Sequence, residues 1–190
     1  MIPALYERFQ DWSKNGSVYI ISDTHFDDED CIKMSRNWIS AEEHIAIIKK
    51  VVHKNDTLIH LGDVGNLEYM KQIKGHKVLL MGNHDCGVSK YKEVFDEVYE
   101  GPLMIGEKIL LSHEPIIGID WALNIHGHDH SGRVSDVFHL NLASNVCGFT
   151  VFSLGEYLKK HGVSKIKSLH RDTIDNATKR KVKRNQKRGV

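Results

Sequence analysis

Residues 79–87 read "LLMGNHDCG", in which a short apolar run gives way to a glycine, an amide, an imidazole and a carboxylate. The apolar run, which starts at Lys77 as "KVLLM", is typical of a buried strand bounded by polar residues. A glycine after such a strand lets the backbone turn sharply, so that the next side chain can face a common site. The stretch therefore predicts a strand that ends directly in a group of metal-type ligands.

Four other apolar runs end in the same way. They are "VYIIS" (18–22), "LIHL" (58–61), "KILLS" (108–112) and "ALNIH" (122–126). The residues that follow them are Asp23 and His25, Gly62 and Asp63, His113, and Gly127, His128, Asp129 and His130. In open α/β sheets, ligands bind in the crevice beyond the carboxyl ends of the strands, where the loops converge. We therefore expect five loops to build one site.

Helical patterns separate the first strands. In residues 40–54, Ser40 and Glu43 form a capping-box pattern, and apolar residues recur after it at helical spacing. Asn66 is placed to cap a shorter helix, and residues 89–98 predict a third one. The alternation of strands and helices implies parallel strands that are joined by crossover helices.

The pattern after residue 100 is richer in strands. Residues 101–112 read as a hairpin around Gly106, and residues 137–144 alternate like a half-solvated strand. A closing helix is predicted at residues 153–162, with a second capping-box pattern at its start. The sequence thus predicts the α/β class with two sheets.

Length and charge suggest one domain followed by a tail. The 190 residues and their 41% apolar content suit a single domain, which we expect to span residues 1–170. Residues 179–188, "KRKVKRNQKR", hold seven of the 26 Lys and Arg and no acidic residue. We therefore expect residues 171–190 to form a basic, flexible tail on a mildly acidic body.

Cysteine usage and the N-terminal residues bear on location. Cys31, Cys86 and Cys147 are odd in number and lack CxxC spacing, which fits a reducing compartment better than a disulfide framework. Residues 1–12 carry charges where a signal peptide needs an apolar segment, and no stretch approaches the length of about 18 apolar residues that spans a membrane. We expect a cytoplasmic protein that does not contact a membrane.

The donor types at the strand ends favour transition metals. Seven side chains are candidate ligands: Asp23, His25, Asp63, Asn83, His113, His128 and His130. Carboxylate, imidazole and amide donors together suit Mn, Fe, Ni or Zn better than Ca or Mg, which avoid nitrogen. Seven ligands exceed the needs of one tetrahedral ion, whereas two ions that share Asp63 would use them all.

These residues also carry a family resemblance. The motifs "DTH", "GD", "GNHD", "SHEP" and "HGHDH", in this order, resemble those of the calcineurin-like metallophosphoesterases over about residues 18–155. The N-terminal half is most similar to small bacterial and phage members. The resemblance implies a four-layer α/β/β/α sandwich of two mixed β-sheets flanked by helices. It also implies hydrolysis of phosphate esters at two divalent metal ions, with Mn²⁺ the first candidate.

The resemblance assigns roles position by position. One metal would be bound by Asp23, His25, Asp63 and His130, and the other by Asp63, Asn83, His113 and His128. The bridging Asp63 and the non-ligand His84 would be catalytic, and His84 and Asn83 would contact the substrate. Arg36 stands where small members often carry an arginine, and it is the candidate phosphate clamp.

One departure from the family pattern concerns the second motif. Phosphoprotein phosphatases read GDxxDR there, whereas this chain reads "GDVGNL", with Asn66 and Leu67 in place of the second acid and the arginine. Without that carboxylate, His84 has less support for the protonated form that a general acid needs. The missing arginine argues against a protein-phosphatase substrate.

For other polar residues we expect structural roles rather than metal binding or catalysis. His60 and His126 each precede a motif glycine in an apolar strand, so we expect core histidines or supports for the ligands. Asp129 is expected to be a turn residue, and Asp85 to orient the GNHD loop through backbone amides. The remaining histidines are expected at the surface: His44, His53, His76, His139, His161 and His170.

Three functions remain open at this point. The first is a metal-dependent phosphoesterase that acts on a small phosphodiester, a phosphate monoester or a nucleotide. The second is a nuclease or RNA-end phosphodiesterase that uses the basic tail to hold nucleic acid. The third is a non-catalytic scaffold on the same fold. The sequence does not decide the native metal, the natural substrate or the oligomeric state.

Overall fold

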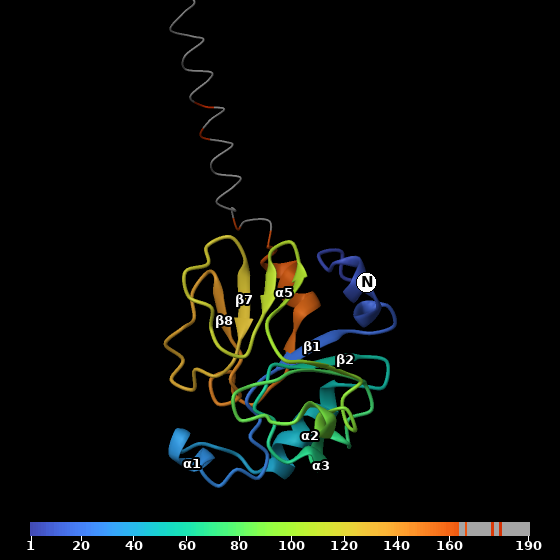
Figure 1. Cartoon of the computed structure of the whole chain (residues 1–190), viewed down its shortest axis with the longest axis vertical. Helices are drawn as coiled ribbons and strands as arrows, with labels where there is room; N and C mark the ends of the chain where they lie inside the picture. The colour runs from blue at the N-terminus through green and yellow to red at the C-terminus, as the bar shows by residue number, and fades with distance from the viewer. Residues whose placement is uncertain (164–165, 167–175, 177–178, 180–190) are drawn as a thin grey trace, which may run out of the picture.

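The computed structural model describes residues 1–163 together with Ile166, Asn176 and Lys179 (Figure 1). Apart from Asn176 and Lys179, the basic tail lies outside the described residues, as does the domain limit at residue 170. Two β-sheets face each other, and the helices α2 (Ala41–Val51) and α3 (Leu67–Met70) lie on the far side of the first sheet (Figure 1).

The first sheet has five strands in the order β4-β3-β2-β1-β9. Their bounds are β4 (Glu97–Tyr99), β3 (His76–Leu80), β2 (Thr57–His60), β1 (Val18–Ile21) and β9 (Phe152–Ser153). Strands β1 to β4 pair in parallel, and β9 pairs antiparallel with β1. The parallel strands that the sequence predicts are therefore confirmed, and β9 makes the sheet mixed.

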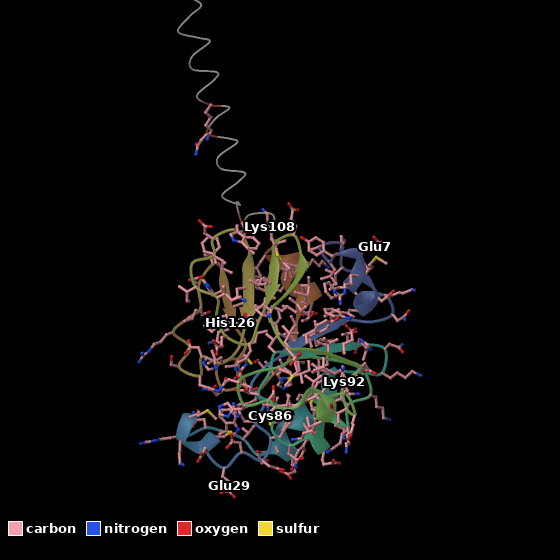
Figure 2. The ribbon with its side chains drawn as sticks, viewed as in Figure 1. Glu7, Glu29, Cys86, Lys92, Lys108 and His126 are labelled. Carbon is pink, nitrogen blue, oxygen red and sulfur yellow. The ribbon has the colours of Figure 1, made fainter. Side chains whose placement is uncertain are left out.

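The second sheet has four strands in the order β5-β6-β7-β8. They are β5 (Leu103–Gly106), β6 (Ile109–Leu111), β7 (Leu123–His126) and β8 (His139–Asn141). The predicted hairpin is confirmed, because β5 pairs antiparallel with β6, whereas β6, β7 and β8 run parallel. Figure 2 shows Lys108, which precedes β6, at one end of this sheet and His126 toward the other, on the side where Cys86 lies.

The predicted helix starts are present. Helix α2 has the full capping box, in which the Ser40 side chain accepts from Glu43 N and the Glu43 side chain accepts from Ser40 N. Asn66 caps α3 by accepting from Glu68 N at 3.1 Å. Helix α5 (Leu154–Lys160) starts at Ser153, whose hydroxyl accepts from Glu156 N at 3.4 Å.

The helix predicted at residues 89–98 is wrong over most of its length. Only one turn, α4 (Val88–Tyr91), is helical, and the segment ends in the strand β4. Asp96 accepts a hydrogen bond from Lys77 N at 2.7 Å, and Val78 pairs with Glu97, so pairing with β3 overrides the local helical pattern. The short helices η1 (Glu7–Ser13) and α1 (Cys31–Met34) were not predicted.

Two apolar clusters hold these layers together. Inward-facing residues of both sheets form the first, including Ile20 and Ile59 from one sheet and Ile109 and Ile125 from the other. The second cluster lies between the first sheet and α2 and α3. Because the parallel strands are covered on both faces, they read in sequence as continuous apolar runs.

The outer face of the second sheet is closed by polar contacts. Its buried residues Asn124, His126 and His139 bond to loop backbone: Asn124 to Ile116 N, His126 to Val134 O and His139 to Ile116 O. The described residues thus show two mixed sheets with α2 and α3 on one side. The second helical layer of the four-layer sandwich remains a prediction. None of the helices in residues 1–163 is long and apolar enough to cross a membrane.

Candidate metal centre

The loops after five strands meet, as the sequence predicts, at the carboxyl ends of the two sheets. Backbone hydrogen bonds join these loops: Asp23 N donates to Gly62 O at 2.9 Å, and His25 N donates to Asp63 O at 3.0 Å. A third contact links the sheets, because His128 N donates to Asp23 Oδ2 at 2.9 Å. The site therefore rests on rigid strands rather than on one flexible loop.

A first group of ligand-type atoms comes from Asp23, His25 and His130, whose donor atoms all lie within 4.8 Å of one another. Asp23 is fully buried, and its Oδ1 lies 3.5 Å from His130 Nε2. Buried polar atoms almost always have a partner. Asp23 Oδ1 and His25 Nε2 have none among the described residues.

A second group comes from Asp63, His113 and His128, with the same 4.8 Å limit between donor atoms. The amide oxygen of Asn83 joins it, at 2.9 Å from His113 Nε2 and 3.0 Å from His128 Nδ1. The structure thus brings together the four residues that the sequence assigns to the second metal.

Asp63 lies between the two groups. Its Oδ2 is 3.6 Å from His25 Nε2 in the first group and 3.3 Å from His113 Nε2 in the second. Its Oδ1 accepts from His84 N at 2.9 Å. This is the position that a bridging carboxylate would need.

Three of the histidines are oriented through their other ring nitrogen. His25 Nδ1 lies 3.1 Å from Asp28 Oδ2, His113 Nδ1 lies 2.9 Å from Leu61 O, and His130 Nδ1 lies 2.8 Å from Asn145 Oδ1. Such contacts fix the ring and leave Nε2 for a metal. Asp28 and Asn145 were not among the predicted site residues. The position of Asp28, three residues after His25, could have indicated its role, whereas no sequence pattern points to Asn145.

The backbone is unusual at the candidate ligands. Asp23, His25, Asp63 and His128 have φ of 55°, 41°, 56° and 63°. The left-handed region costs L-residues energy, and such residues gather at functional sites. Four of the six non-glycine residues with positive φ in the described part are thus candidate ligands.

The motif positions require glycine for two different reasons. Gly62 has φ of 104°, as the sharp turn requires. Gly82 and Gly127 are needed for space instead: a Cβ on Gly82 would lie 2.3 Å from Asp63 Oδ1, and one on Gly127 would lie 2.0 Å from Asp23 Oδ2. The absence of a side chain lets the loops approach the carboxylates.

Burial and charge set the protonation of the centre. Burial acts to raise the pKa of Asp63, but the contact with His113 and the bond from His84 N outweigh it and lower the pKa to about 2. Burial lowers the pKa of His25, against the opposing charges of Asp63 and Asp23. For His113, burial lowers the pKa, but the contact with Asp63 raises it overall. An ionised carboxylate beside a neutral imidazole is the form that binds metal.

Asp85 supports the loop as predicted. Its carboxylate accepts from Asp63 N at 2.8 Å, Gly82 N at 2.9 Å and the Tyr91 hydroxyl at 2.9 Å. Asp129 likewise closes a turn by accepting from Ser131 N and Val134 N.

The remaining predicted site residues lie at the exposed mouth. Asn83, His84 and His128 are exposed, and the His84 ring centroid is 5.4 Å from that of His25. Arg36 is also exposed, in the segment between α1 and α2, and no hydrogen bond or ion pair among the described residues joins it to a candidate ligand. Its role as a phosphate clamp remains a prediction.

Two histidines outside the centre are more buried than predicted. His60 is fully buried and bonds to the Thr24 hydroxyl, and His126 bonds to Val134 O, so both are core residues as expected. His44 and His139, predicted at the surface, are 1% and 6% exposed. Tertiary packing on α2 and β8 covers them.

A third group of ligand-type atoms contains His25, Asp28 and Cys31. Burial raises the pKa of the Cys31 thiol to about 12. A protonated thiol is a poor ligand, and Asp28 already orients His25. This group therefore supports the first one rather than forming a separate centre.

Three known proteins are similar to this chain in sequence or in structure. No family model matches the chain. A solved structure of the protein of unknown function AQ665 from Aquifex aeolicus is 30% identical with a TM-score of 0.65, over 76% of this chain and 98% of that chain. The nuclease MPE from Pseudomonas putida is 22% identical with a TM-score of 0.41, over 58% of this chain and 60% of that chain. The uncharacterized protein MJ1445 from Methanocaldococcus jannaschii is 30% identical in an alignment of 142 positions that covers 65% of this chain and 75% of that protein. The chain therefore belongs to the same family as MJ1445.

Proposed function

We infer that this protein is a metal-dependent phosphoesterase of the metallophosphoesterase superfamily, with two divalent metal ions that share Asp63. The observation that carries this inference is a pair of buried atoms, Asp23 Oδ1 and His25 Nε2, that have no hydrogen-bond partner among the described residues. They lie beside Asp63, a carboxylate that contacts both ligand groups. A protein that used these residues only for stability would leave a costly defect in its core.

The residues fit such ions by donor type. Asp23, His25, Asp63 and His130 would hold one ion, and Asp63, Asn83, His113 and His128 the other. Imidazole nitrogen together with carboxylate and amide oxygen suits Mn, Fe, Ni or Zn. When bound, such ions lower the pKa of water toward neutrality and neutralise phosphate oxygens.

The surrounding residues supply positioning. His84 N is held by Asp63 Oδ1 at 2.9 Å, which places the exposed imidazole at the mouth of the centre, where a phosphate ester would enter. Asn66 is engaged elsewhere, because its side chain donates to Asp27 Oδ2 at 2.7 Å and caps α3. Residue 66 therefore provides no carboxylate partner for His84. We assign to the neutral His84 imidazole a hydrogen bond to the leaving oxygen of the ester.

The test is a hydrolysis panel on metal-reconstituted protein. It compares a chromogenic phosphomonoester, its diester, 2′,3′-cyclic nucleotides and RNA. Asp63→Asn should lower turnover at least about a hundredfold, the scale of losing a transition-state electrostatic contact. Asp11→Asn, at an exposed carboxylate in η1, is the matched control.

The panel also separates the alternatives. A nuclease that uses the tail would lose RNA affinity in a salt-dependent way when the seven basic residues of 179–188 are changed to Gln. A scaffold would bind metal and hydrolyse none of the substrates. Elemental analysis that found no metal after reconstitution would contradict the proposal itself.

A further inference from the structure

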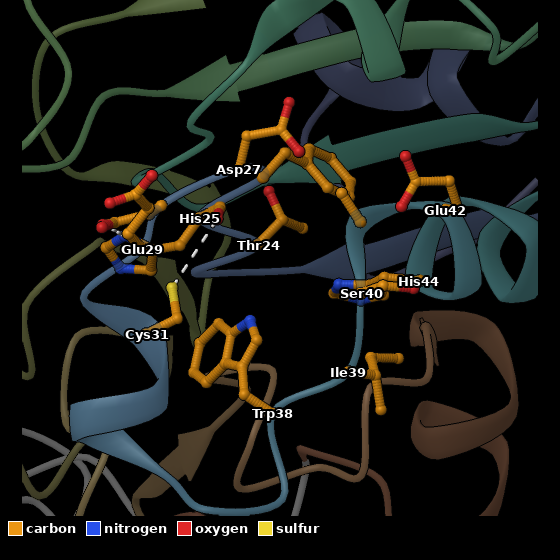
Figure 3. A pocket seen from close by; sticks show the side chains of 13 residues that line it. Thr24, His25, Asp27, Glu29, Cys31, Trp38, Ile39, Ser40, Glu42 and His44 are labelled. Carbon is orange, nitrogen blue, oxygen red and sulfur yellow. Dashed lines mark hydrogen bonds and ion pairs between the residues drawn. The ribbon is translucent and has the colours of Figure 1, made fainter.

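A cavity of about 500 Å³ opens beside the first ligand group. It is lined by the loop after β1, from Thr24 to Cys31, and by the segment from Trp38 to the start of α2 (Figure 3). His25 belongs both to this cavity and to the candidate metal centre. A phosphate at the centre would therefore have its organic group next to the cavity, whose volume lies in the range of ligand pockets.

The charge of this cavity has one sign. Four carboxylates line it, those of Asp27, Asp28, Glu29 and Glu42, and none of its lining residues is Lys or Arg. The Tyr69 hydroxyl lies 2.8 Å from Glu42 Oε1 and 3.1 Å from Asp27 Oδ1, so the two carboxylates share its single hydrogen. The bonds to these two carboxylates and their charges raise the pKa of Tyr69. The side chains that line the cavity therefore contribute a negative potential to it.

The remaining wall is aromatic and apolar. The Trp38 indole lies between Cys31 and Ile39 and points toward the side of Thr24 and His25 (Figure 3). Behind it, Phe149 packs edge-on against both Trp38 and His44, at 5.4 Å in each case. His44 lines the cavity and is 1% exposed, and its Nε2 has no hydrogen-bond partner among the described residues. This part of the wall therefore keeps one unused hydrogen-bonding position.

We propose that this cavity takes a cationic organic group, an alkylammonium, of a phosphate ester whose phosphate lies at the metal centre. Carboxylates attract the positive charge, and the face of an indole binds ammonium groups within about 6 Å. The assignment rests on the proposed function and adds the substrate class. A second phosphate in this cavity would face four carboxylates, which disfavours nucleoside di- and triphosphates.

A matched pair of substrates tests the assignment. p-Nitrophenylphosphorylcholine carries a trimethylammonium group, and p-nitrophenyl 3,3-dimethylbutyl phosphate is its neutral isostere with carbon in place of nitrogen. Both release p-nitrophenolate, so the reacting bond is the same. Full-length, metal-reconstituted protein should prefer the cationic ester at least about tenfold in kcat/KM, on the scale of a few surface charge interactions.

The variant test uses the exposed rim. Glu29→Gln combined with Glu42→Gln should reduce the ratio of the two kcat/KM values to about threefold or less, because two of the four charges are removed. Glu93→Gln, at an exposed residue that does not line the cavity, should leave the ratio unchanged.

The outcomes separate this inference from the proposed function. Equal hydrolysis of both esters, preference for the neutral one, or hydrolysis of bis(p-nitrophenyl) phosphate with neither of the pair would overturn the cationic assignment and keep the phosphoesterase. If nothing is hydrolysed, the proposed function fails. Calorimetric titration with phosphorylcholine and with 3,3-dimethylbutyl phosphate then decides, since equal or absent binding overturns the cavity assignment too.

Discussion

The two ends of the first sheet carry the same kinds of residue in opposite states. At the amino end, Glu97 accepts from Trp12 Nε1 and His76 Nε2, both at 2.8 Å, and from the Tyr99 hydroxyl at 2.5 Å. At the carboxyl end, the carboxylate of Asp23 and the imidazole of His25 each have a buried atom that no described residue hydrogen-bonds. One network is closed, and the other has capacity left for a ligand.

The backbone shows the same contrast. Positive φ is found at Asp23, His25, Asp63 and His128, whereas none of the four residues of the Glu97 network has it. A polar cluster that serves stability has paired atoms on relaxed backbone. Strained backbone together with unpaired atoms indicates a site whose stabilising partner is a ligand.

The sharpest way to break this comparison is Asp23→Asn. We expect metal-supported turnover to fall at least about a hundredfold, because the amide removes the charge that would hold a cation. The free energy of unfolding of the chelator-treated protein should not fall, since an amide oxygen can still accept from His128 N. The measurements are kcat/KM on a chromogenic diester and urea unfolding. Normal turnover with a loss of stability would make Asp23 a structural residue.

Glu97→Ala should show the reverse pattern. Three donors lose their acceptor, so the free energy of unfolding should fall by about 1–2 kcal/mol. Turnover should stay unchanged, because the network lies at the opposite end of the strands. Glu100→Ala, at an exposed residue just after β4, is the control for loss of a carboxylate. A turnover defect in folded Glu97→Ala protein would show that the two ends are coupled.

The smallest expected effect concerns pH. Burial lowers the pKa of His44 from 6.5 to about 4, so between these values the unfolded chain binds a proton that the folded protein does not. This contribution to stability is present above pH 6.5 and is lost as the pH falls, by roughly 0.7 kcal/mol between pH 7 and pH 6.

His44→Gln should remove that part of the pH dependence, which urea unfolding of chelator-treated protein at several pH values measures. The exposed His53 provides the control His53→Gln, whose pH dependence should match that of the unaltered protein. An unaltered pH dependence in His44→Gln would mean that burial does not keep this imidazole neutral.

Local signals accounted for much of the fold. Apolar runs located β1, β2, β3, β6 and β7, and Ser40 and Asn66 marked real helix starts. The helix prediction for residues 89–98 was wrong because their helical pattern competes with strand pairing between Val78 and Glu97. Local sequence does not encode that pairing. The antiparallel β9, of two residues, is too short to show a period.

The candidate centre was more predictable than its supports. The candidate ligands follow the carboxyl ends of strands. Their positions in the sequence were therefore enough to predict that Asp23, Asp63 and His113 lie at one edge of the sheets. Asn145, which orients His130, comes from the region after β8, and its pairing depends on tertiary structure. His44 was misplaced for the same reason, since its ring is enclosed by Phe26 and Phe149.

The hydrogen bonds between the outer face of the second sheet and its loops determine how this protein would tolerate loop insertions. Asn124, His126 and His139 hold the neighbouring loops through a small number of hydrogen bonds, so a longer loop there would replace a few directional contacts and leave the apolar interior intact. Loop grafts that start after Ile116 or after Val134 keep the candidate ligands His113, His128 and His130 in place. They are therefore the natural place to engineer new recognition elements next to the metal centre without redesigning the protein's interior.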